Sequence, residues 1–189
     1  MPRNVLFVKK HSDTRVTNAF KDAIHYLRKT YDDINIIVEE STAHELVPDF
    51  QDLISFRAEE KALLAEKTDF VIALGGDGSI LHVSSLFDQH AVPPVLSFSM
   101  GTLGFLLPYD VRAFPEAVND VFHSRFSLAL RKRLCMGLWD SRPEQCLWLP
   151  GENSCRELHF MNEMVLHRGS DPHMTTMDAF VDGEHLTRT

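Results

Sequence analysis

The sequence has 189 residues, of which 44% are hydrophobic and 24% charged, with a formal net charge of −8 and a pI of about 5.6. This composition excludes a disordered chain, and the acidic balance argues against a nucleic-acid surface. No apolar run approaches the roughly 18 residues of a membrane helix, and no signal peptide precedes the first predicted strand. These features predict a cytoplasmic protein, with a mitochondrial location as the alternative if the natural start is missing.

The first forty residues are typical of a β-α-β unit. Residues 4–8 and 34–38 are apolar runs that predict strands. Between them, apolar residues recur at helical spacing from Val16 to Leu27, followed by the basic Arg28 and Lys29. This order predicts parallel strands joined by a right-handed crossover. Residues 41–68 are less informative, apart from a predicted helix near residues 59–66.

A glycine-rich turn follows the predicted strand at residues 70–74 and precedes a predicted helix at residues 80–87. The turn reads Gly75-Gly76-Asp77-Gly78, and glycine allows a phosphate to approach backbone N–H groups closely. A carboxylate at this position would repel a phosphate unless it binds a metal ion or accepts a proton from an attacking hydroxyl. Both tasks belong to phosphoryl transfer. The alternative is a simple turn, with Asp77 as the N-cap of the helix.

A second glycine loop follows the next predicted strand, at residues 95–99. It contains Gly101, Gly104 and Phe105, and we expect it to lie beside the first loop at the same edge of the sheet. The Phe105 ring could stack on an aromatic base or seal the loop to the core. The sequence alone favours the core, because most Phe residues are buried for packing.

The pattern changes after a predicted helix at residues 113–122 that Asp110 or a neighbour can cap. Alternating apolar residues from Phe126 onward indicate antiparallel strands, and Asp182-Gly183 predicts a hairpin turn. The fold class is therefore α/β, with a Rossmann-like parallel-sheet domain at residues 1–125 and the beginning of an all-β antiparallel domain at residues 126–189. Because the predicted second sheet is barely started, we expect the chain to be a fragment of a longer protein.

Several polar residues are ambiguous when taken one by one. Asn162 and Glu163 interrupt the apolar run at residues 158–166, where they could bind a ribose or a base edge or could be an exposed pair. His82 lies close to the predicted phosphate site, yet a lone His is more often an ordinary helix residue. The three cysteines lack metal-binding spacing and are interpreted as reduced structural thiols, and no metal-ligating set is predicted.

Taken together, these residues resemble the NAD kinase family, the ATP-dependent enzymes that make NADP from NAD. The matching segments, in family order, are Gly75-Gly76-Asp77-Gly78-Ser79-x-Leu81-His82, Gly101-Thr102-Leu103-Gly104-Phe105, Asn162-Glu163, His167-Arg168-Gly169 and Val181-Asp182-Gly183-Glu184. The Gly-Gly-Asp-Gly segment alone is shared with phosphofructokinases and with lipid kinases. The segments 4–10 and 167–169 look like those of a fungal-type member related to the NADH kinases.

The resemblance implies a role for each matching residue. Asp77 would accept the proton of the adenosine 2′-hydroxyl as that oxygen attacks the γ-phosphate of ATP. The nucleotide-binding residues that it implies are Gly76, Asp77, Gly78, His82, Phe105, Asn162, Glu163 and His173. It also implies a divalent cation, usually Mg²⁺, with ATP and NAD(H) as substrates and a homo-oligomer for the full-length protein. No nucleic acid or membrane partner is expected.

One family motif is missing from the sequence: the segment that leads into Thr-Pro-Thr-Gly-Ser-Thr-Ala-Tyr. Because that motif supplies much of the dinucleotide pocket in the family, we expect this chain to be inactive by itself. Two alternatives remain: another kinase with the same turn that acts on a lipid or sugar phosphate, or a non-catalytic fragment that binds full-length subunits. The sequence does not distinguish NAD from NADH or identify the phosphoryl donor.

Overall fold

The computed structural model describes residues 3–10, 13–87, 91–101, 104–137, 158–170, 173 and 176–188. In chain order the elements are β1 (Asn4–Lys9), α1 (Thr14–Thr30), β2 (Asn35–Glu39), α2 (Glu40–Leu46), β3 (Ile54–Phe56), α3 (Lys61–Lys67), β4 (Phe70–Gly75), α4 (Asp77–Leu86), β5 (Val95–Ser99), β6 (Tyr109–Asp110), α5 (Phe114–Phe122), β7 (Leu134–Met136), β8 (Leu158–Phe160), β9 (Asp178–Val181) and β10 (Glu184–Arg188). Short 3₁₀ turns at Ala58–Glu60 and Val111–Ala113 precede α3 and α5. Among the described residues, no helix combines the length and apolar character that crossing a bilayer requires.

The six-stranded sheet has the order β3-β2-β1-β4-β5-β6, and every neighbouring pair in it is parallel. The chain moves outward from β1 to β3 on one side, then crosses to β4 and continues to β6 on the other. The carboxyl ends of the central strands are aligned, since Lys9 pairs with Leu74 and Gly75 pairs with Ser99. Ligands of open parallel sheets bind at the carboxyl edge where the winding reverses, which here lies between β1 and β4.

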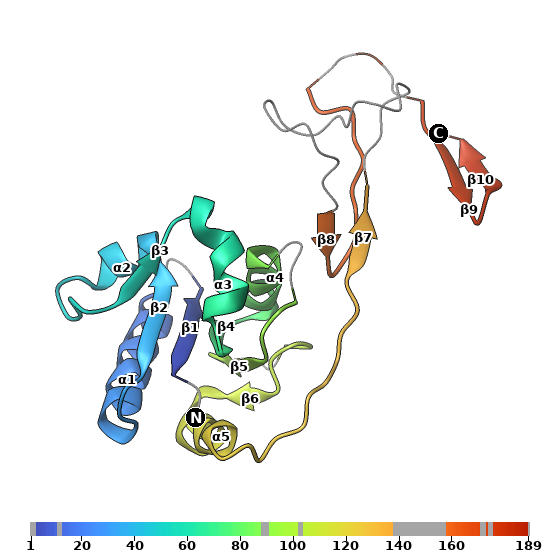
Figure 1. The fold of residues 1–189 in the computed structure, drawn as a ribbon. Coiled ribbons are helices and arrows are strands. Elements are labelled where there is room, and N and C mark those ends of the chain that lie inside the picture. The colour runs from blue at the N-terminus through green and yellow to red at the C-terminus, as the bar shows by residue number, and fades with distance from the viewer. Residues whose placement is uncertain are drawn as a thin grey trace.

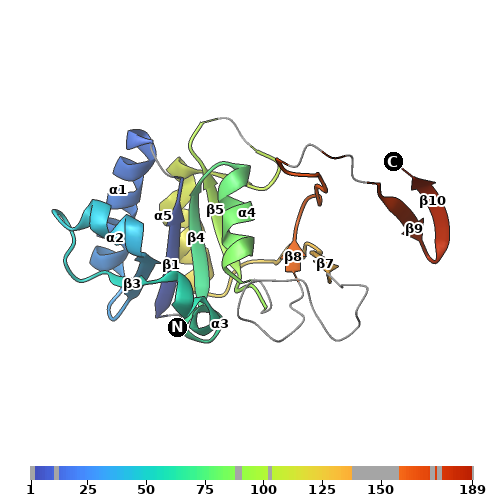
Figure 2. The ribbon, with the colours of Figure 1, turned by 90° about the horizontal axis from the view of Figure 1, so that it is seen from above.

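Helices cover both faces of the sheet (Figures 1 and 2). Helices α1 and α5 pack on one face, against residues such as Phe7 of β1 and Ile72 of β4. Helices α3 and α4 pack on the other face, against the intervening residues such as Val8 and Ala73. Strand β4 is buried along its whole length. Its continuous apolar sequence follows from burial on both faces and is typical of a parallel strand.

Two short elements in the less informative stretch were not predicted from the sequence. Helix α2 has seven residues, of which Thr42 and Leu46 are buried, and β3 has three residues that extend the sheet beside β2. Elements this short contain too few apolar positions to show a recognisable periodic pattern. The helix predicted near residues 59–66 is confirmed as α3 and the 3₁₀ turn before it.

Beyond α5, the described strands form two antiparallel pairs, β7 with β8 and β9 with β10. The predicted hairpin turn is confirmed, because Asp182 and Gly183 have φ angles of 51° and 86°, the positive values of a type I′ turn. The alternating residues that begin at Phe126 do not form a strand at once, and the first described strand after α5 is the antiparallel β7 at Leu134–Met136. Phe126, Leu128 and Leu130 are exposed and lie outside any strand, since no described strand pairs with them.

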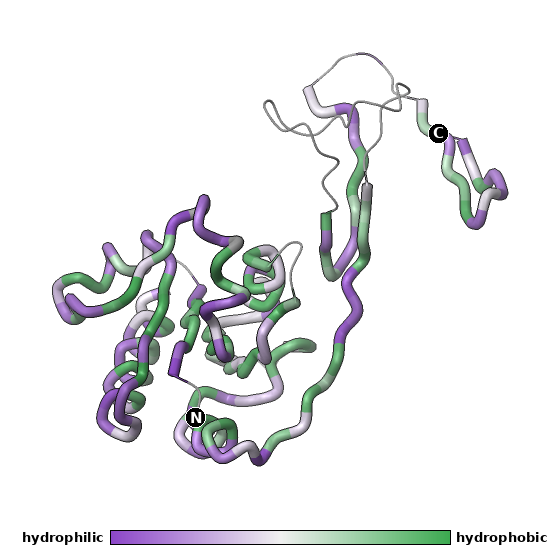
Figure 3. Tube along the Cα trace, in the orientation of Figure 1, coloured by the Kyte–Doolittle hydropathy of each residue, from purple (hydrophilic) through white to green (hydrophobic). Residues whose placement is uncertain are grey.

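The second region is far less buried than the first. Every residue of β9 and β10 is exposed, and Figure 3 shows both hydrophobic and hydrophilic colours along this hairpin. The hairpin lies apart from the parallel sheet in Figures 1 and 2. Within the described chain, α5 ends at Phe122 and β7 begins at Leu134, so the domain boundary near residue 126 stays a prediction.

Candidate functional site

The turn between β4 and α4 needs its glycines for two different reasons. Gly75 has a φ of +152°, and a Cβ atom there would collide with Oγ of Ser79 and lie 3.0 Å from Cβ of Lys10. Gly75 is therefore required by local packing and backbone conformation. By contrast, a Cβ atom on Gly76 or Gly78 would meet nothing within 4 Å. The surface above these two glycines is open, so a ligand can lie directly against the main chain.

Asp77 joins this turn to the second glycine loop. It is the first residue of α4, whose N-cap is Gly76 and has no side-chain capping bond, so the alternative that made Asp77 the N-cap is wrong. Instead, the carboxylate accepts the backbone N–H of Phe105 at Oδ2 (3.1 Å) and that of Leu106 at Oδ1 (2.9 Å). The expectation that the two loops lie side by side is confirmed.

The half-buried Asp77 carboxylate keeps capacity for another proton donor. A carboxylate oxygen has about two acceptor positions, and each oxygen here uses one for a loop N–H. The two bonds fix the orientation of the group without using all of its lone pairs. Asp77 can therefore accept a hydrogen bond from a hydroxyl group that approaches from the open side of the turn.

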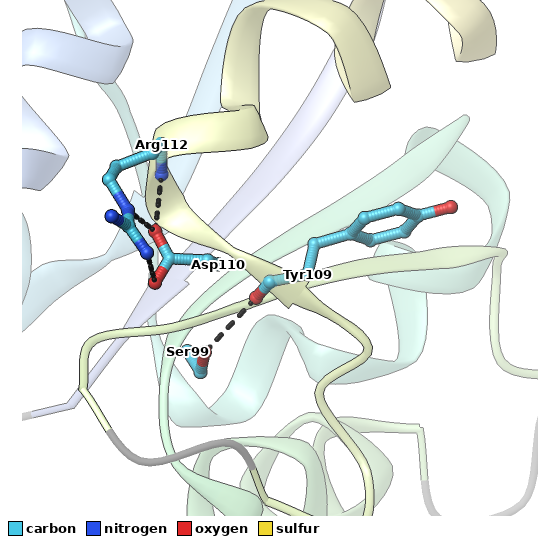
Figure 4. A network of polar contacts seen from close by, with 4 residues as sticks. All are labelled: Ser99, Tyr109, Asp110 and Arg112. Atoms are coloured by element: carbon cyan, nitrogen blue, oxygen red, sulfur yellow. Dashed lines mark hydrogen bonds and ion pairs between the residues drawn. The ribbon is translucent and has the colours of Figure 1, made fainter.

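The second loop is anchored to β5 by two buried serines. Ser97 donates its hydroxyl to the Leu106 carbonyl at 3.1 Å, and Ser99 donates to the Tyr109 carbonyl at 3.2 Å. Figure 4 shows the second bond and, beside it, the contact between Asp110 and Arg112. Asp110 caps the turn before α5, as predicted, by accepting the Arg112 N–H. The side-chain hydrogen bond from Arg112 lowers the pKa of the Asp110 carboxyl below its ordinary value of 3.8.

His82 lies one turn further along α4 and contacts the end of β2. Its Nε2 atom lies 3.0 Å from Oε1 and 2.9 Å from Oε2 of Glu39. The two side chains are 37% and 19% exposed, so the pair is neither buried nor fully solvated. Glu39 is a partner that the sequence analysis missed, because nothing in the pattern connected the end of β2 to α4.

Phe105 is not a core residue, which corrects the packing interpretation. Its side chain is 94% exposed, and its N–H is bound to Asp77. The core position in this segment is taken by Leu107, which is 1% exposed and packs in the cluster beneath α4. Arg131, which the sequence analysis did not single out, places Nη2 3.4 Å from the Phe105 carbonyl. The Phe105 ring thus stands at the surface beside the two loops.

The described contacts do not bring the remaining predicted site residues to Asp77. Asn162 and Glu163 are exposed and follow the end of β8 at Phe160. They come directly after Met161, which packs against the cluster beneath α4. His173 is exposed. These three residues stay predictions.

The remaining residues with possible chemical roles are the metal-ligand types, the cysteines and Lys10. Within the described residues, no three His, Cys, Asp or Glu side chains converge in a way that could hold a metal ion. Cys135 is exposed on β7, while Cys146 and Cys155 lie outside the described residues. Lys10, another residue that sequence reasoning did not assign, lies at the end of β1 beside Gly75. The sequence feature that could have identified Lys10 is the pair of lysines after the first predicted strand.

Comparisons with known proteins show which family this chain resembles in sequence. Residues 5–126 match the family described as ATP-NAD kinase N-terminal domain. The mitochondrial NADH kinase of Schizosaccharomyces pombe is 39% identical over 186 residues, which are 98% of this chain and 44% of that protein. The mitochondrial NADH kinase of Saccharomyces cerevisiae is 36% identical over 195 residues, covering 99% of this chain and 45% of that protein.

A solved structure extends the likeness to the fold. The crystal structure of yeast NADH kinase complexed with NADH matches with a TM-score of 0.79 at 35% identity, over 100% of this chain and 55% of that chain. The chain thus spans about half the length of the relatives that it matches. The family match covers most of the parallel-sheet region, including both glycine loops, and so the chain belongs to the NAD kinase family.

Proposed function

We propose that the chain carries the catalytic carboxylate and the phosphate-binding turn of an enzyme that phosphorylates NAD or NADH. ATP would transfer its γ-phosphoryl group to the 2′-hydroxyl of the adenosine ribose, which gives NADP or NADPH. One observation carries the proposal: Asp77 stands at the reversal point of the sheet, oriented by two backbone N–H groups, with open glycine backbone on both sides. The names of the fungal relatives support NADH as the first acceptor to test.

Asp77 would act as the proton acceptor. As the 2′-oxygen attacks the γ-phosphorus and the bond to the β-phosphate oxygen breaks, the hydroxyl proton moves to a carboxylate oxygen. The two loop hydrogen bonds support this role, because they hold the group in one orientation before substrate arrives. General-base assistance of this kind contributes about 10²- to 10⁴-fold to a rate.

The open backbone at Gly76 and Gly78 would receive the phosphates. The N-terminus of α4 lacks a side-chain cap, and the N–H groups of Asp77 and Gly78 at this end of the helix would bind a phosphate. Mg²⁺ enters this proposal as part of the Mg-ATP substrate. There it would neutralise phosphate charge.

The dinucleotide contacts are carried over from the family resemblance. His82, Phe105, Asn162, Glu163 and His173 would contact the nucleotide, and all five are at least partly exposed. The exposed ring of Phe105 is suited to stacking on a base, because stacking would remove the apolar face of the ring from water. We also propose a homo-oligomer for the full-length protein. The two fungal relatives, both named as mitochondrial, support the mitochondrial alternative over the cytoplasmic one.

The test is NADPH formation from NADH and Mg-ATP, with NAD as the second acceptor. It is run on this chain and on a chimaera in which the chain replaces the matching part of yeast NADH kinase. We expect the chimaera to be active and the kcat of its Asp77→Asn variant to be at least about 100-fold lower. A folded chimaera that phosphorylates neither dinucleotide, but labels a lipid or a sugar phosphate from radioactive ATP, would replace the proposal with the alternative kinase class.

A further inference from the structure

Lys9, the last residue of β1, and Lys10, the residue that follows it, have opposite environments. The side chain of Lys9 is fully buried, and its Nζ atom lies 2.7 Å from Oε2 of Glu45 on α2. Its charge is therefore paired with a carboxylate of this chain. Lys10, the next residue, is exposed, and none of the described carboxylates forms an ion pair with it. Only one of the two ammonium groups is thus available to a ligand.

The backbone holds Lys10 against the glycine-rich turn. Its N–H donates to the Leu74 carbonyl at 2.9 Å, which extends the pairing of β1 with β4 by one residue. Its Cβ atom is so close to Gly75 that a side chain there would approach to 3.0 Å. Because side chains alternate along a strand and Val8 packs beneath α4, Lys10 leaves β1 on the α4 side. Its side chain thus starts at the edge of the open surface above Gly76.

We propose that Lys10 binds the phosphate groups of ATP that lie on the Gly76–Gly78 turn. This inference rests on the proposed function and adds a residue to it. The triphosphate carries about four negative charges and would lie next to the Asp77 carboxylate, on a chain whose formal net charge is −8. Glycine backbone supplies N–H groups but no full positive charge. Lys10 is a described cation beside this turn, and lysine serves as a mobile point charge for phosphate.

Lys29 provides a matched control. It is an exposed lysine in the last turn of α1. That end of α1 leads into Asn35, which pairs with Asn4 at the opposite, amino-terminal edge of the sheet. Removing its charge changes the net charge of the protein by the same amount, far from the turn. Any difference between the two variants therefore reports on position and not on total charge.

The experiment titrates the chain with two fluorescent probes, mant-ATP with Mg²⁺ and mant-adenosine, which lacks phosphates. We expect Lys10→Met to weaken mant-ATP binding about 10- to 100-fold, the usual loss when a hydrogen bond to a charged group is removed. Lys10→Arg, which keeps the charge, should lose much less, and Lys29→Met should bind like the wild type. Mant-adenosine should bind all four proteins equally. Added KCl should weaken mant-ATP binding to the wild type more steeply than to Lys10→Met.

Equal mant-ATP affinities for the wild type and Lys10→Met would overturn the proposal, as would an equal loss in Lys29→Met. If Lys10→Met does not fold, Lys10→Gln replaces it, judged by circular dichroism. The result is separable from the proposed function, because binding is measured without an acceptor. If ATP binding depends on Lys10 but the protein never forms NADP(H), the role of Lys10 in ATP binding stands and the dinucleotide is rejected as the acceptor.

Discussion

The carboxylate of Asp77 lies in the space that a side chain on Gly104 would occupy. A Cβ atom at position 104 would collide with Oδ1 of Asp77 and lie 2.9 Å from its Cγ. The missing side chain lets the second loop come close enough to donate its backbone N–H groups to the carboxylate. The glycine of one loop and the acid of the other are therefore a matched pair.

Gly104→Ala should displace the Asp77 carboxylate without removing it. We expect kcat of the active chimaera to fall about 10- to 100-fold, because small misplacements of a reacting group have effects of this size. The KM for ATP should change less than about threefold, since the open glycines of the first turn are untouched. Steady-state kinetics give both values. A melting temperature near that of the parent must accompany the loss, and an unchanged kcat would contradict the matched pair.

Asp77→Asn should reduce turnover far more than it weakens ATP binding. An amide cannot take the hydroxyl proton, so we expect kcat to fall at least about 100-fold while the Kd for ATP changes little. Asp110→Asn is the control, because Asp110 is a carboxylate at the end of β6, which β5 separates from β4, and it has a different contact, Arg112. Equal losses in kcat and in ATP affinity would exclude the proton-acceptor role.

The two glycines at the start of the turn should separate stability from function. Gly75→Ala introduces a side chain at a φ of +152° and against Ser79, so we expect it to lower the free energy of unfolding by roughly 1–3 kcal/mol. Gly76→Ala meets nothing within 4 Å and should change stability by less than about 1 kcal/mol, yet weaken ATP binding. Urea unfolding and ATP titration of both variants check this. Two variants with the same profile would refute the distinction.

Acid titration should reveal the contact between Asp110 and Arg112. Because the Arg112 hydrogen bond lowers the pKa of Asp110 below 3.8 in the folded protein, its stabilising effect is complete above pH 3.8. That effect is lost as the pH falls through the folded pKa. In a carbon-detected NMR titration, Arg112→Ala should move the Asp110 midpoint up toward 3.8. The remaining shift comes from the backbone N–H of residue 112. If the Asp110 midpoint does not move in Arg112→Ala, the guanidinium is not the cause of the lowered pKa.

Much of the parallel sheet could be predicted from the sequence. Strand β4 and its glycine turn could be predicted because burial on both faces produces an unbroken apolar run that stops at Gly75. The side-by-side arrangement of the two loops followed from parallel strands ending at one edge. The short elements α2 and β3 could not be predicted, because their positions depend on packing against β2 and not on a periodic pattern of their own.

The details of the site depended on contacts that no local pattern encodes. Phe105 looked like a core residue by type, but Leu107 fills that position and the Phe105 side chain is exposed. The contact of His82 with Glu39 joins residues far apart in the sequence. Likewise, nothing in the Lys9-Lys10 pair indicates which lysine is buried until α2 supplies Glu45. Residue type suggested the chemistry, and the fold decided which residues could perform it.

The hydrogen bonds from Phe105 and Leu106 to Asp77 give the protein a built-in spectroscopic reporter. The amide protons of these two residues should resonate downfield because they are bound to a carboxylate, and both signals should move together when a substrate hydroxyl binds to the same group. A ¹⁵N-labelled sample would therefore let the arrival of a substrate at the proposed catalytic group be followed directly, without turnover and without any change to the sequence.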